Sequence, residues 1–341
     1  MSPTLPSTYK AAVFEAAGKP LTLKSLPMQK PGPNEVLIKV LACGVCHTDI
    51  HIGDGQFGDV FPRVPGHEMV GDVVSVGSSC VRFKGGERVG GAYHGGHDGT
   101  CKACLTGDTQ MCDNQAVNGL TREGGYAEYC LLREEAVVRV SKDLDVAAVA
   151  PILCAGLTVY NGMRNLDVRA GSLVAIQGLG GLGHLAVQYA AKMGYHVVAI
   201  SSGDAKRKFA KELGAHEYID TSKEDPARKL QEMGGAKMIV ATAPSPKAVS
   251  PLVNGLGVRG KLLSLPPMGP MPVDTVHMVI KGASVHGWAV GSPVDCEETL
   301  EFTALTGIEC MIEKFKLDDV HKAVEKLQKG EIRFRGVLLM D

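Results

Sequence analysis

The stretch SLVAIQGLGGLGHLAVQYAAKM, residues 172–193, decides the fold that the sequence predicts. Its opening run of apolar residues predicts a buried strand at 172–177, and the longer apolar segment from Gly181 to Met193 predicts a helix. Between them lies a glycine-rich turn. A strand, a glycine turn and a helix in this order are typical of one unit of a parallel sheet.

The glycines of this turn follow the pattern G-x-G-x-x-G at Gly178, Gly180 and Gly183. Between a strand and a helix, such glycines let the backbone approach a pyrophosphate at the N-terminus of the helix. We therefore predict a dinucleotide site in this loop, which also contains Gly181. A plain tight turn is the alternative.

The rest of the chain shows two different patterns of apolar residues. From residue 172 onward, apolar strands alternate with helices, so we expect an α/β fold with a doubly wound parallel sheet. Residues 1–150 instead show short alternating strands at 35–40, 69–77 and 126–132, an all-β pattern. After residue 291 we expect two helices, near 296–306 and 317–328, and a final strand.

Composition limits the possible functions. The chain has 341 residues, a net charge of −1 and 45% hydrophobic residues, which describes a globular protein of two domains. The sequence contains no basic patch of the kind that would indicate a nucleic-acid or membrane-surface role. No window of 18 apolar residues and no leader pattern is present, so we expect a cytoplasmic protein.

The ten cysteines need an explanation that suits a reducing compartment, where clustered cysteines bind metals or catalyse more often than they form disulfides. Cys80, Cys130, Cys296 and Cys310 stand alone among apolar residues, and we interpret them as buried thiols.

Three side chains in the remaining sequence match a catalytic zinc site. Cys46, His67 and Cys154 would supply two thiolates and an imidazole and leave one position open, the usual ligand set of a zinc ion that polarises an oxygen. The alternative is that Cys43 and Cys46 form a redox pair, but the thioredoxin-like setting of such a pair is absent.

A second cluster lies at 97–112, HDGTCKACLTGDTQMC. Cys101, Cys104 and Cys112 are close enough in sequence to share one metal ion, although a tetrahedral site normally has four ligands. Asp98 and His97 are the candidates for the fourth.

The end of the second strand of the parallel sheet predicts which nucleotide binds. NAD sites place Asp or Glu there to bind the ribose, whereas this chain has Ser201 and Ser202, followed by Lys206 and Arg207. Hydroxyls and cations suit a 2′-phosphate, which favours NADP(H). In the alternative, Asp204 binds the ribose and the cations are solvated.

These motifs together resemble a known family. GHE (66–68), CHTD (46–49), CAGLTVY (154–160), the cysteine cluster and GLGGLG (178–183) occur in the order found in zinc-dependent medium-chain alcohol dehydrogenases, most like the yeast-type and cinnamyl-alcohol-type branch. The resemblance covers essentially the whole chain. It implies a GroES-like β catalytic domain at 1–155 and 292–341, and a Rossmann domain at 156–291.

The resemblance also implies catalytic roles. Cys46, His67 and Cys154 match the catalytic zinc ligands. Glu68 matches a carboxylate that can exchange onto the metal, and Asp49 matches the residue that orients the ligand histidine. Thr48 matches the hydroxyl that bonds the substrate oxygen, and His51 matches the outer base of a proton relay. Alternatively, Thr48 caps a helix and His51 is a surface imidazole.

Further positions match the cofactor and substrate contacts of the family. His47 and Arg335 match cations near the pyrophosphate, and Thr158 matches a contact beside the nicotinamide. Phe57 and Tyr93 match aromatic walls of the substrate pocket, with core packing as the alternative.

The resemblance also suggests the fourth ligand of the second cluster. The family's structural zinc loop has four cysteines, and Asp98 stands in the first of these positions. Carboxylate oxygen is an acceptable zinc ligand, so we expect a structural zinc held by Asp98, Cys101, Cys104 and Cys112. An empty loop or a disulfide is the alternative.

The expected function is hydride transfer between NADP(H) and a primary alcohol or aldehyde, aromatic ones included, with zinc as a second cofactor. The alternatives are a zinc-free quinone or enone reductase on the same fold and a nonenzymatic relative. We expect a homodimer or homotetramer that pairs through an edge strand near 283–288, with no nucleic-acid or membrane partner.

Overall fold

The computed structural model describes residues 5–340, which form two compact units. The first unit comprises the chain up to Cys154, Val290–Leu305 and the chain from Glu309 onward. The second comprises Ala155–Ala289 and Thr306–Ile308. The polypeptide therefore leaves the first unit, builds the second, and returns.

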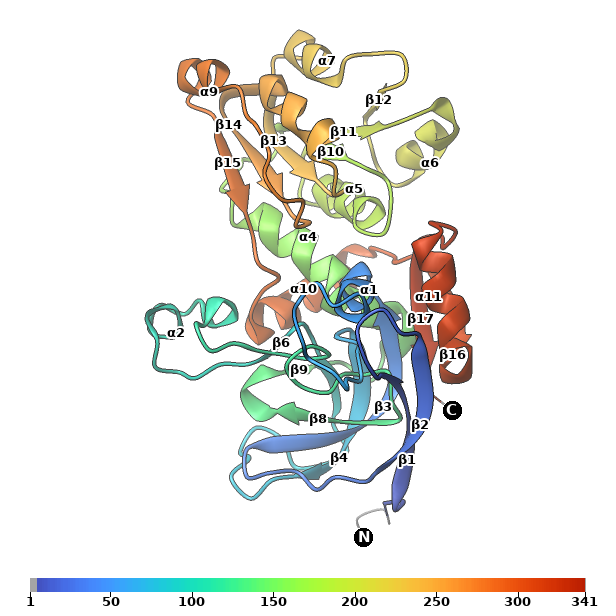
Figure 1. The fold of residues 1–341 in the computed structure, drawn as a ribbon. Helices are drawn as coiled ribbons and strands as arrows, with labels where there is room; N and C mark the ends of the chain where they lie inside the picture. The colour runs from blue at the N-terminus through green and yellow to red at the C-terminus, as the bar shows by residue number, and fades with distance from the viewer. Residues whose placement is uncertain (1–4, 341) are drawn as a thin grey trace. The chain divides into compact units, whose positions relative to one another are not determined.

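The second unit is built on a parallel sheet of six strands (Figure 1). The strands are β10 (Leu173–Gln177), β11 (His196–Ser201), β12 (Glu217–Asp220), β13 (Ala236–Ala241), β14 (Leu256–Ser264) and β15 (Ser284–Gly287). Their spatial order is β12-β11-β10-β13-β14-β15, which numbered along the chain is 3-2-1-4-5-6. This is the strand order of dinucleotide-binding doubly wound folds, so the α/β prediction is confirmed.

The helices of this unit are short; α4 precedes the first strand, and the others lie between successive strands. They are α4 (Ala155–Arg164), α5 (Gly183–Lys192), α6 (Arg207–Glu212), α7 (Pro226–Glu232), α8 (Pro246–Val249) and α9 (Thr275–Lys281). Helix α5 packs on α4, β10 and β11. It begins at Gly183, two residues later than predicted, because residues 180–182 form the turn out of β10.

Burial in the sheet follows from composition. In β10, β11 and β13 the apolar side chains are almost completely buried; Ile176, Val198 and Ile239 are 0% exposed. Strands covered on both faces have continuous apolar sequences rather than alternating ones. Strand β15 is at the end of the strand order and is an edge strand, as predicted for 283–288.

The first unit contains a seven-stranded, mainly antiparallel sheet. Its strands are β3 (Glu35–Val45), β4 (Met69–Val76), β5 (Arg88–Gly91), β8 (Tyr129–Arg133), β9 (Val137–Arg139), β16 (Ile312–Lys316) and β17 (Arg335–Leu339). β3 is central and pairs with β4, β8 and β17. Pairing of Gly336 with Val45 in β17 and β3 brings the end of the chain beside the segment that contains Cys46.

The remaining elements of this unit surround that sheet. They are the antiparallel pair β1 (Thr8–Phe14) and β2 (Leu21–Pro27), the short pair β6 (His94–Gly96) and β7 (Ala116–Val117), and the helices α1 (His47–Gly53), α2 (Lys102–Thr106), α3 (Val146–Val149), α10 (Pro293–Thr306) and α11 (Val320–Gln328). The strands predicted at 35–40 and 69–77 and the two late helices are confirmed with shifted bounds. The strand predicted at 126–132 begins only at Tyr129.

The cysteines predicted to be isolated and buried are only partly so. Cys130 and Cys296 are buried, but Cys80 and Cys310 are half-buried, so that prediction is wrong for the latter two. All ten cysteines are free thiols.

No single helix among residues 5–340 is long and apolar enough to cross a bilayer, although the bent pair Val146–Leu153 and Ala155–Arg164 reaches the required length and composition when taken together.

Candidate functional site

Four side chains that can bind a metal meet in the first unit. The ligand atoms of Cys46, His67, Glu68 and Cys154 all lie within 4.8 Å of one another, and all four residues are buried. Cys46 lies between β3 and α1, His67 and Glu68 directly precede β4, and Cys154 follows the 3-10 helix Ala150–Leu153. Antiparallel pairing of Cys43 with Met69 brings the first two segments together. The three predicted catalytic zinc ligands are therefore neighbours.

The cluster fits a divalent cation because two of its polar atoms are unused. Nε2 of His67 and Oε2 of Glu68 are buried and have no hydrogen-bond partner. Buried polar atoms without partners are rare and costly, so each needs an explanation. The adjacent Cys154 side chain lowers the pKa of Cys46 well below its usual value, which favours a thiolate. A soft thiolate, an imidazole nitrogen and a second sulfur match zinc.

Asp49 fixes two of these ligands with one carboxylate. Its Oδ1 is 3.0 Å from Nδ1 of His67 and accepts from the backbone N–H of Gly66 at 3.1 Å. Its Oδ2 accepts from the backbone N–H of Cys46 at 2.9 Å and from the hydroxyl of Tyr126 at 2.9 Å. The bond to Nδ1 fixes the ring so that Nε2 is directed at the sulfurs.

Arg335 is paired inside this unit. Its guanidinium donates to Oε1 of Glu68, and both side chains are buried. Burial raises the pKa of Glu68 to about 7, while the charge of Arg335 opposes that shift. Arg335 was predicted as a cation near the pyrophosphate; with 2% of its surface exposed, its first partner is Glu68. Nε of Arg335 is buried without a partner.

Helix α1 presents the predicted proton-handling residues. Cys46 is its N-cap residue, so Thr48 lies inside the first turn and does not cap the helix. Oγ1 of Thr48 is 3.7 Å from Sγ of Cys46. His51 is half-buried and its Nδ1 is buried without a partner, which differs from a surface imidazole. Residues 48 and 51 are three apart and so share one face of the helix, whereas His47 is exposed.

The two predicted pocket aromatics differ in their surroundings. Tyr93 makes an edge contact with the His67 ring, with centroids 5.5 Å apart, and packs with Ile52, Val117 and Leu120. Phe57 is 41% exposed, so simple core packing does not explain it.

The second cluster also forms. Ligand atoms of Asp98, Cys101, Cys104 and Cys112 lie within 4.8 Å of one another. Sγ of Cys101 is 3.5 Å from that of Cys104 and 3.8 Å from that of Cys112, too far for a disulfide. Asp98 accepts hydrogen bonds from Asn114 and the backbone of Thr100 and Cys101, which lower its pKa. Nδ1 of His97, the other candidate ligand, instead lies 3.1 Å from Nε2 of His94.

The loop around this cluster has almost no apolar core. Helix α2 contains no buried residue, and Leu105 is 73% exposed. Three thiols gather here without an apolar core to hold them, an arrangement typical of loops that fold around a metal ion. One carboxylate in place of a thiolate is still an acceptable donor set for zinc.

The glycine loop of the second unit has the geometry that a pyrophosphate requires. Gly178 has φ +92°, and a Cβ on Gly183 would lie 2.0 Å from the carbonyl oxygen of Gly178. A Cβ on Gly180 would meet no atom within 4 Å, so its backbone faces open space. A tight turn, an accessible backbone and close packing of helix on strand are the three roles of this pattern. Gly181 lies in the turn before α5.

Beyond β11, the predicted phosphate contacts are accessible. Ser201 ends β11, while Ser202 and Lys206 are exposed. Asp204, the alternative ribose ligand, accepts from Nε of Arg207 at 2.7 Å, and that guanidinium lies over the Tyr218 ring. Asp204 and Arg207 therefore neutralise each other. Thr158, in α4, is buried.

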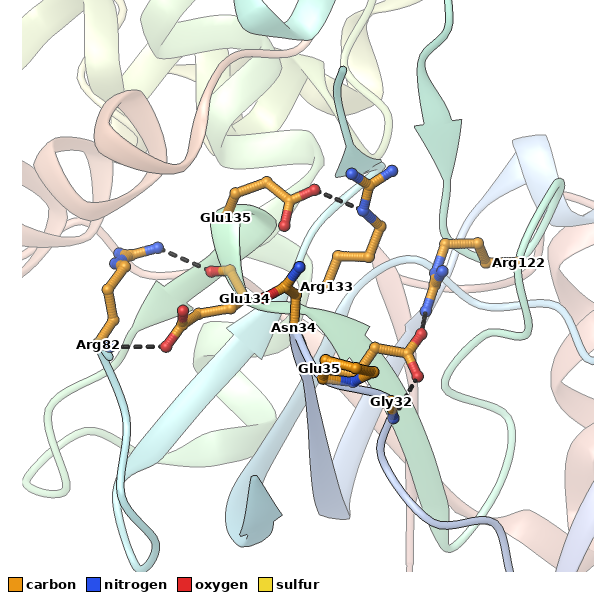
Figure 2. A pocket seen from close by; sticks show the side chains of 9 residues that line it. Gly32, Asn34, Glu35, Arg82, Arg122, Arg133, Glu134 and Glu135 are labelled. Carbon is orange, nitrogen blue, oxygen red and sulfur yellow. Dashed lines mark hydrogen bonds and ion pairs between the residues drawn. The ribbon is translucent and has the colours of Figure 1, made fainter. Parts of the chain in front are cut away.

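A pocket of about 500 Å³ in the first unit is a separate feature (Figure 2). Arg82, Arg122 and Arg133 line it together with Glu35, Glu134 and Glu135. Figure 2 shows these arginines bonded to acceptors within the pocket itself. The N–O distance is 2.5 Å both from Arg122 to Glu35 and from Arg133 to Glu135. These charges balance one another, so we interpret the pocket as a structural ion-pair network.

Two contacts were not anticipated from the sequence. The pair of Arg335 with Glu68 joins residues 267 apart, and no local pattern indicates it. The bond from Tyr126 to Asp49 joins residues 77 apart. The glycine pair Gly124–Gly125 in front of Tyr126 was a usable signal, because adjacent glycines mark close backbone approach.

Comparisons with known proteins agree with this geometry. Residues 32–142 match the model of the alcohol dehydrogenase GroES-like domain, and residues 181–305 match that of the zinc-binding dehydrogenase. A curated relative, the alcohol dehydrogenase patD of Penicillium expansum, is 52% identical over 340 residues, which cover 100% of both chains. The chain belongs to the zinc-dependent medium-chain alcohol dehydrogenase family.

Solved structures give the same class. A cinnamyl alcohol dehydrogenase from Sorghum bicolor has a TM-score of 0.89 at 33% identity and covers 97% of each chain. An acetophenone reductase from Geotrichum candidum, solved in complex with NAD, has a TM-score of 0.87 at 29% identity, with 99% of this chain and 98% of that chain covered. The protein is thus an oxidoreductase of alcohols that uses zinc and a nicotinamide cofactor.

Proposed function

We propose that this enzyme interconverts primary alcohols and aldehydes, aromatic ones included, with NADP(H) as the preferred cofactor and with Cys46, His67 and Cys154 as catalytic zinc ligands. One observation carries the proposal: these three side chains are buried close together, and Nε2 of His67 has no hydrogen-bond partner. A zinc ion held there supplies Lewis-acid polarisation of the substrate oxygen.

The chain's own residues perform the remaining steps. Asp49 holds the His67 ring in the orientation that directs Nε2 at the cluster. The hydroxyl of Thr48 binds the substrate oxygen and accepts its proton during oxidation, and His51, on the same face of α1, passes that proton onward. Glu68 is the carboxylate that can exchange onto the metal, and its ion pair with Arg335 holds it beside the site. Tyr93 and Phe57 would form apolar walls that suit an aromatic ring.

The same cluster disfavours the alternatives. Three convergent metal ligands would have no role in a zinc-free quinone or enone reductase, and Thr48 and His51 beside them would have no role in a nonenzymatic relative.

The structural zinc site is proposed to consist of Asp98, Cys101, Cys104 and Cys112. We propose that the enzyme works in the cytoplasm, where ten cysteines can remain thiols.

The nucleotide would bind mainly in the second unit. Gly178, Gly180, Gly181 and Gly183 would receive the pyrophosphate at the N-terminus of α5, with His47, Thr158 and Arg335 as further contacts carried over from the family. At the adenosine end, Ser201, Ser202 and Lys206 would hold a 2′-phosphate. Asp204, the alternative ribose ligand, is bonded to Arg207.

The experiment that tests the function is a panel of aldehydes and alcohols assayed with NADPH and NADH in parallel, together with the zinc content of the purified protein. We expect about two zinc ions per chain and faster turnover with NADPH. Turnover that survives complete removal of zinc would exclude the proposed chemistry.

A carboxylate at position 201 should reverse the cofactor preference. In Ser201→Asp, a charge about 5 Å from the 2′-phosphate would cost roughly 3 kcal/mol at an effective dielectric of about 20, so kcat/KM for NADPH should fall about 100-fold. The value for NADH should rise or stay constant, because Asp can bond the ribose hydroxyls. Steady-state kinetics with both nucleotides measure the ratio.

The matched control for this substitution is Ser172→Asp. It introduces the same charge just before the start of β10, at the opposite end of the strands from the predicted binding edge. Its cofactor ratio should equal that of the wild type. An unchanged ratio in Ser201→Asp would contradict the proposed 2′-phosphate contact.

We propose that the enzyme is a homo-oligomer, a dimer or tetramer, that pairs through β15. This edge strand leaves backbone groups available, and nearby helix α9 exposes Val276, Val279 and Ile280, which are 67%, 81% and 73% exposed. Edges of this kind pair readily with a second chain. Replacing Val279 and Ile280 by lysine should shift the native mass, measured by light scattering, toward the monomer. Leu305→Lys, at an 85% exposed position on α10, should leave it unchanged.

A further inference from the structure

The loop that carries His67 is clamped by a second segment, Glu123–Tyr126. Backbone N–H groups of Gly124, Gly125 and Tyr126 donate to the carbonyl oxygens of Val64, Gly66 and Pro65 at 2.8, 2.9 and 3.0 Å. Oε2 of Glu123 accepts from the backbone N–H of Val64 at 2.7 Å. The clamp therefore bonds to each of the three residues before His67.

The clamp depends on small residues on both sides. A Cβ on Gly124 would lie 2.3 Å from the carbonyl oxygen of Gly66, and a Cβ on Gly66, whose φ is +102°, would lie 2.4 Å from the Tyr126 ring. Contacts this short leave no room for a side chain. The ring of Tyr126 is therefore packed directly against the backbone of the histidine loop.

Tyr126 ends the clamp with its hydroxyl directed at Asp49. The side chain is 0% exposed, and its hydroxyl donates to Oδ2 of Asp49 at 2.9 Å. Burial raises the pKa of Tyr126 well above its usual value, so the hydroxyl keeps its proton and remains a donor. Hydrogen bonds from a neutral donor to an ionised carboxylate are among the stronger ones in proteins.

Asp49 needs this donor because it is 2% exposed and water cannot solvate it. The two donors to Oδ2 are the backbone of Cys46 and Tyr126, and the two atoms facing Oδ1 belong to Gly66 and His67. If the hydroxyl were removed, Oδ2 would keep only the donor from Cys46, and the carboxylate could turn about its terminal torsion, which is broad. The bond to His67 would then be less well fixed.

We propose that Tyr126 is a positioning residue of the catalytic metal site, whose hydroxyl locks the Asp49 carboxylate and through it the His67 ring. This inference rests on the proposed function, since it assumes that the cluster of Cys46, His67 and Cys154 holds zinc. Residues that orient a ligand histidine typically change metal affinity 10- to 100-fold when replaced. Tyr126 bonds to Asp49 rather than to the histidine itself, so we expect a change in metal affinity near the lower end of that range.

The test is zinc release from Tyr126→Phe, which deletes one oxygen atom and keeps the ring. A chromogenic chelator in excess reports the release, and the variants Cys46→Ser and Cys104→Ser assign the two kinetic phases to the two clusters. We expect release from the catalytic cluster to accelerate about 10-fold, with the phase of the Asp98 cluster unchanged.

The matched control is Tyr195→Phe. Tyr195 is also buried and its hydroxyl donates to the carbonyl oxygen of Val168 at 3.2 Å, in the other unit. Both variants lose one hydrogen bond from the hydroxyl of a buried tyrosine, but only Tyr126→Phe should speed release. A second measurement replaces the catalytic zinc by cobalt, whose visible absorption bands should shift in Tyr126→Phe alone.

Three results would overturn the inference: a release rate within twofold of the wild type, an unchanged cobalt spectrum, or equal acceleration of both phases, which would indicate general destabilisation. Failure of the proposed function has a different signature. In that case the wild-type protein itself would lack the phase assigned to the catalytic cluster.

Discussion

Replacing Cys46 by serine is expected to lower kcat/KM by about 1000-fold or more for every alcohol and aldehyde tested. The substitution removes a ligand from the buried cluster that would hold the catalytic zinc. Lewis-acid stabilisation by a metal contributes several kcal/mol, and each 1.36 kcal/mol corresponds to a factor of ten in rate. Steady-state kinetics measure the loss, and elemental analysis should give one zinc per chain fewer.

Nucleotide binding separates this outcome from misfolding. The glycine loop belongs to the other unit, so the dissociation constant for NADPH, measured by fluorescence titration, should change by less than about threefold. Cys80→Ser alters a half-buried thiol outside both clusters and should retain wild-type turnover. Full activity in Cys46→Ser would show that the cluster is not the reaction centre.

The second large effect is expected from Cys104→Ser in the other cluster. Because the loop around it has almost no buried apolar side chains, loss of the metal should unfold residues 97–115 locally. We expect one zinc per chain to be lost, rapid proteolysis within that loop, and a destabilisation of about 2–3 kcal/mol, which lowers Tm by roughly 5–10 °C. Calorimetry and limited proteolysis measure these changes.

Asp98 can be tested in the same loop by the opposite change. Asp98→Cys supplies a fourth thiolate and should slow zinc release from this cluster, because thiolates bind zinc more tightly than carboxylates. If Asp98 only accepts hydrogen bonds from the backbone of Thr100 and Cys101, the substitution should leave the rate of zinc release unchanged or raise it. Cys80→Ser again serves as the control for thiol chemistry.

Local features of the sequence were predicted well. Apolar runs such as that of β10 identify strands because a strand buried on both faces has few polar positions. The glycine loop was predictable for a related reason, since the positive φ of Gly178 and the close approach of Gly183 to the carbonyl oxygen of Gly178 are demands that arise within the loop itself. The errors concerned boundaries, as at Tyr129, and the burial of Cys80 and Cys310, because exposure depends on which distant segments cover a residue.

The sequence by itself determined the alternation of strands and helices, the glycine turn, and the stock of possible metal ligands, because these depend on interactions between residues close along the chain. Only the tertiary structure decided which ligands meet. The pairing of β3 with β4 and β17 brings Cys46, His67 and Arg335 together, and the clamp brings Tyr126 to Asp49. Such contacts join residues tens to hundreds of positions apart, and no local pattern encodes them.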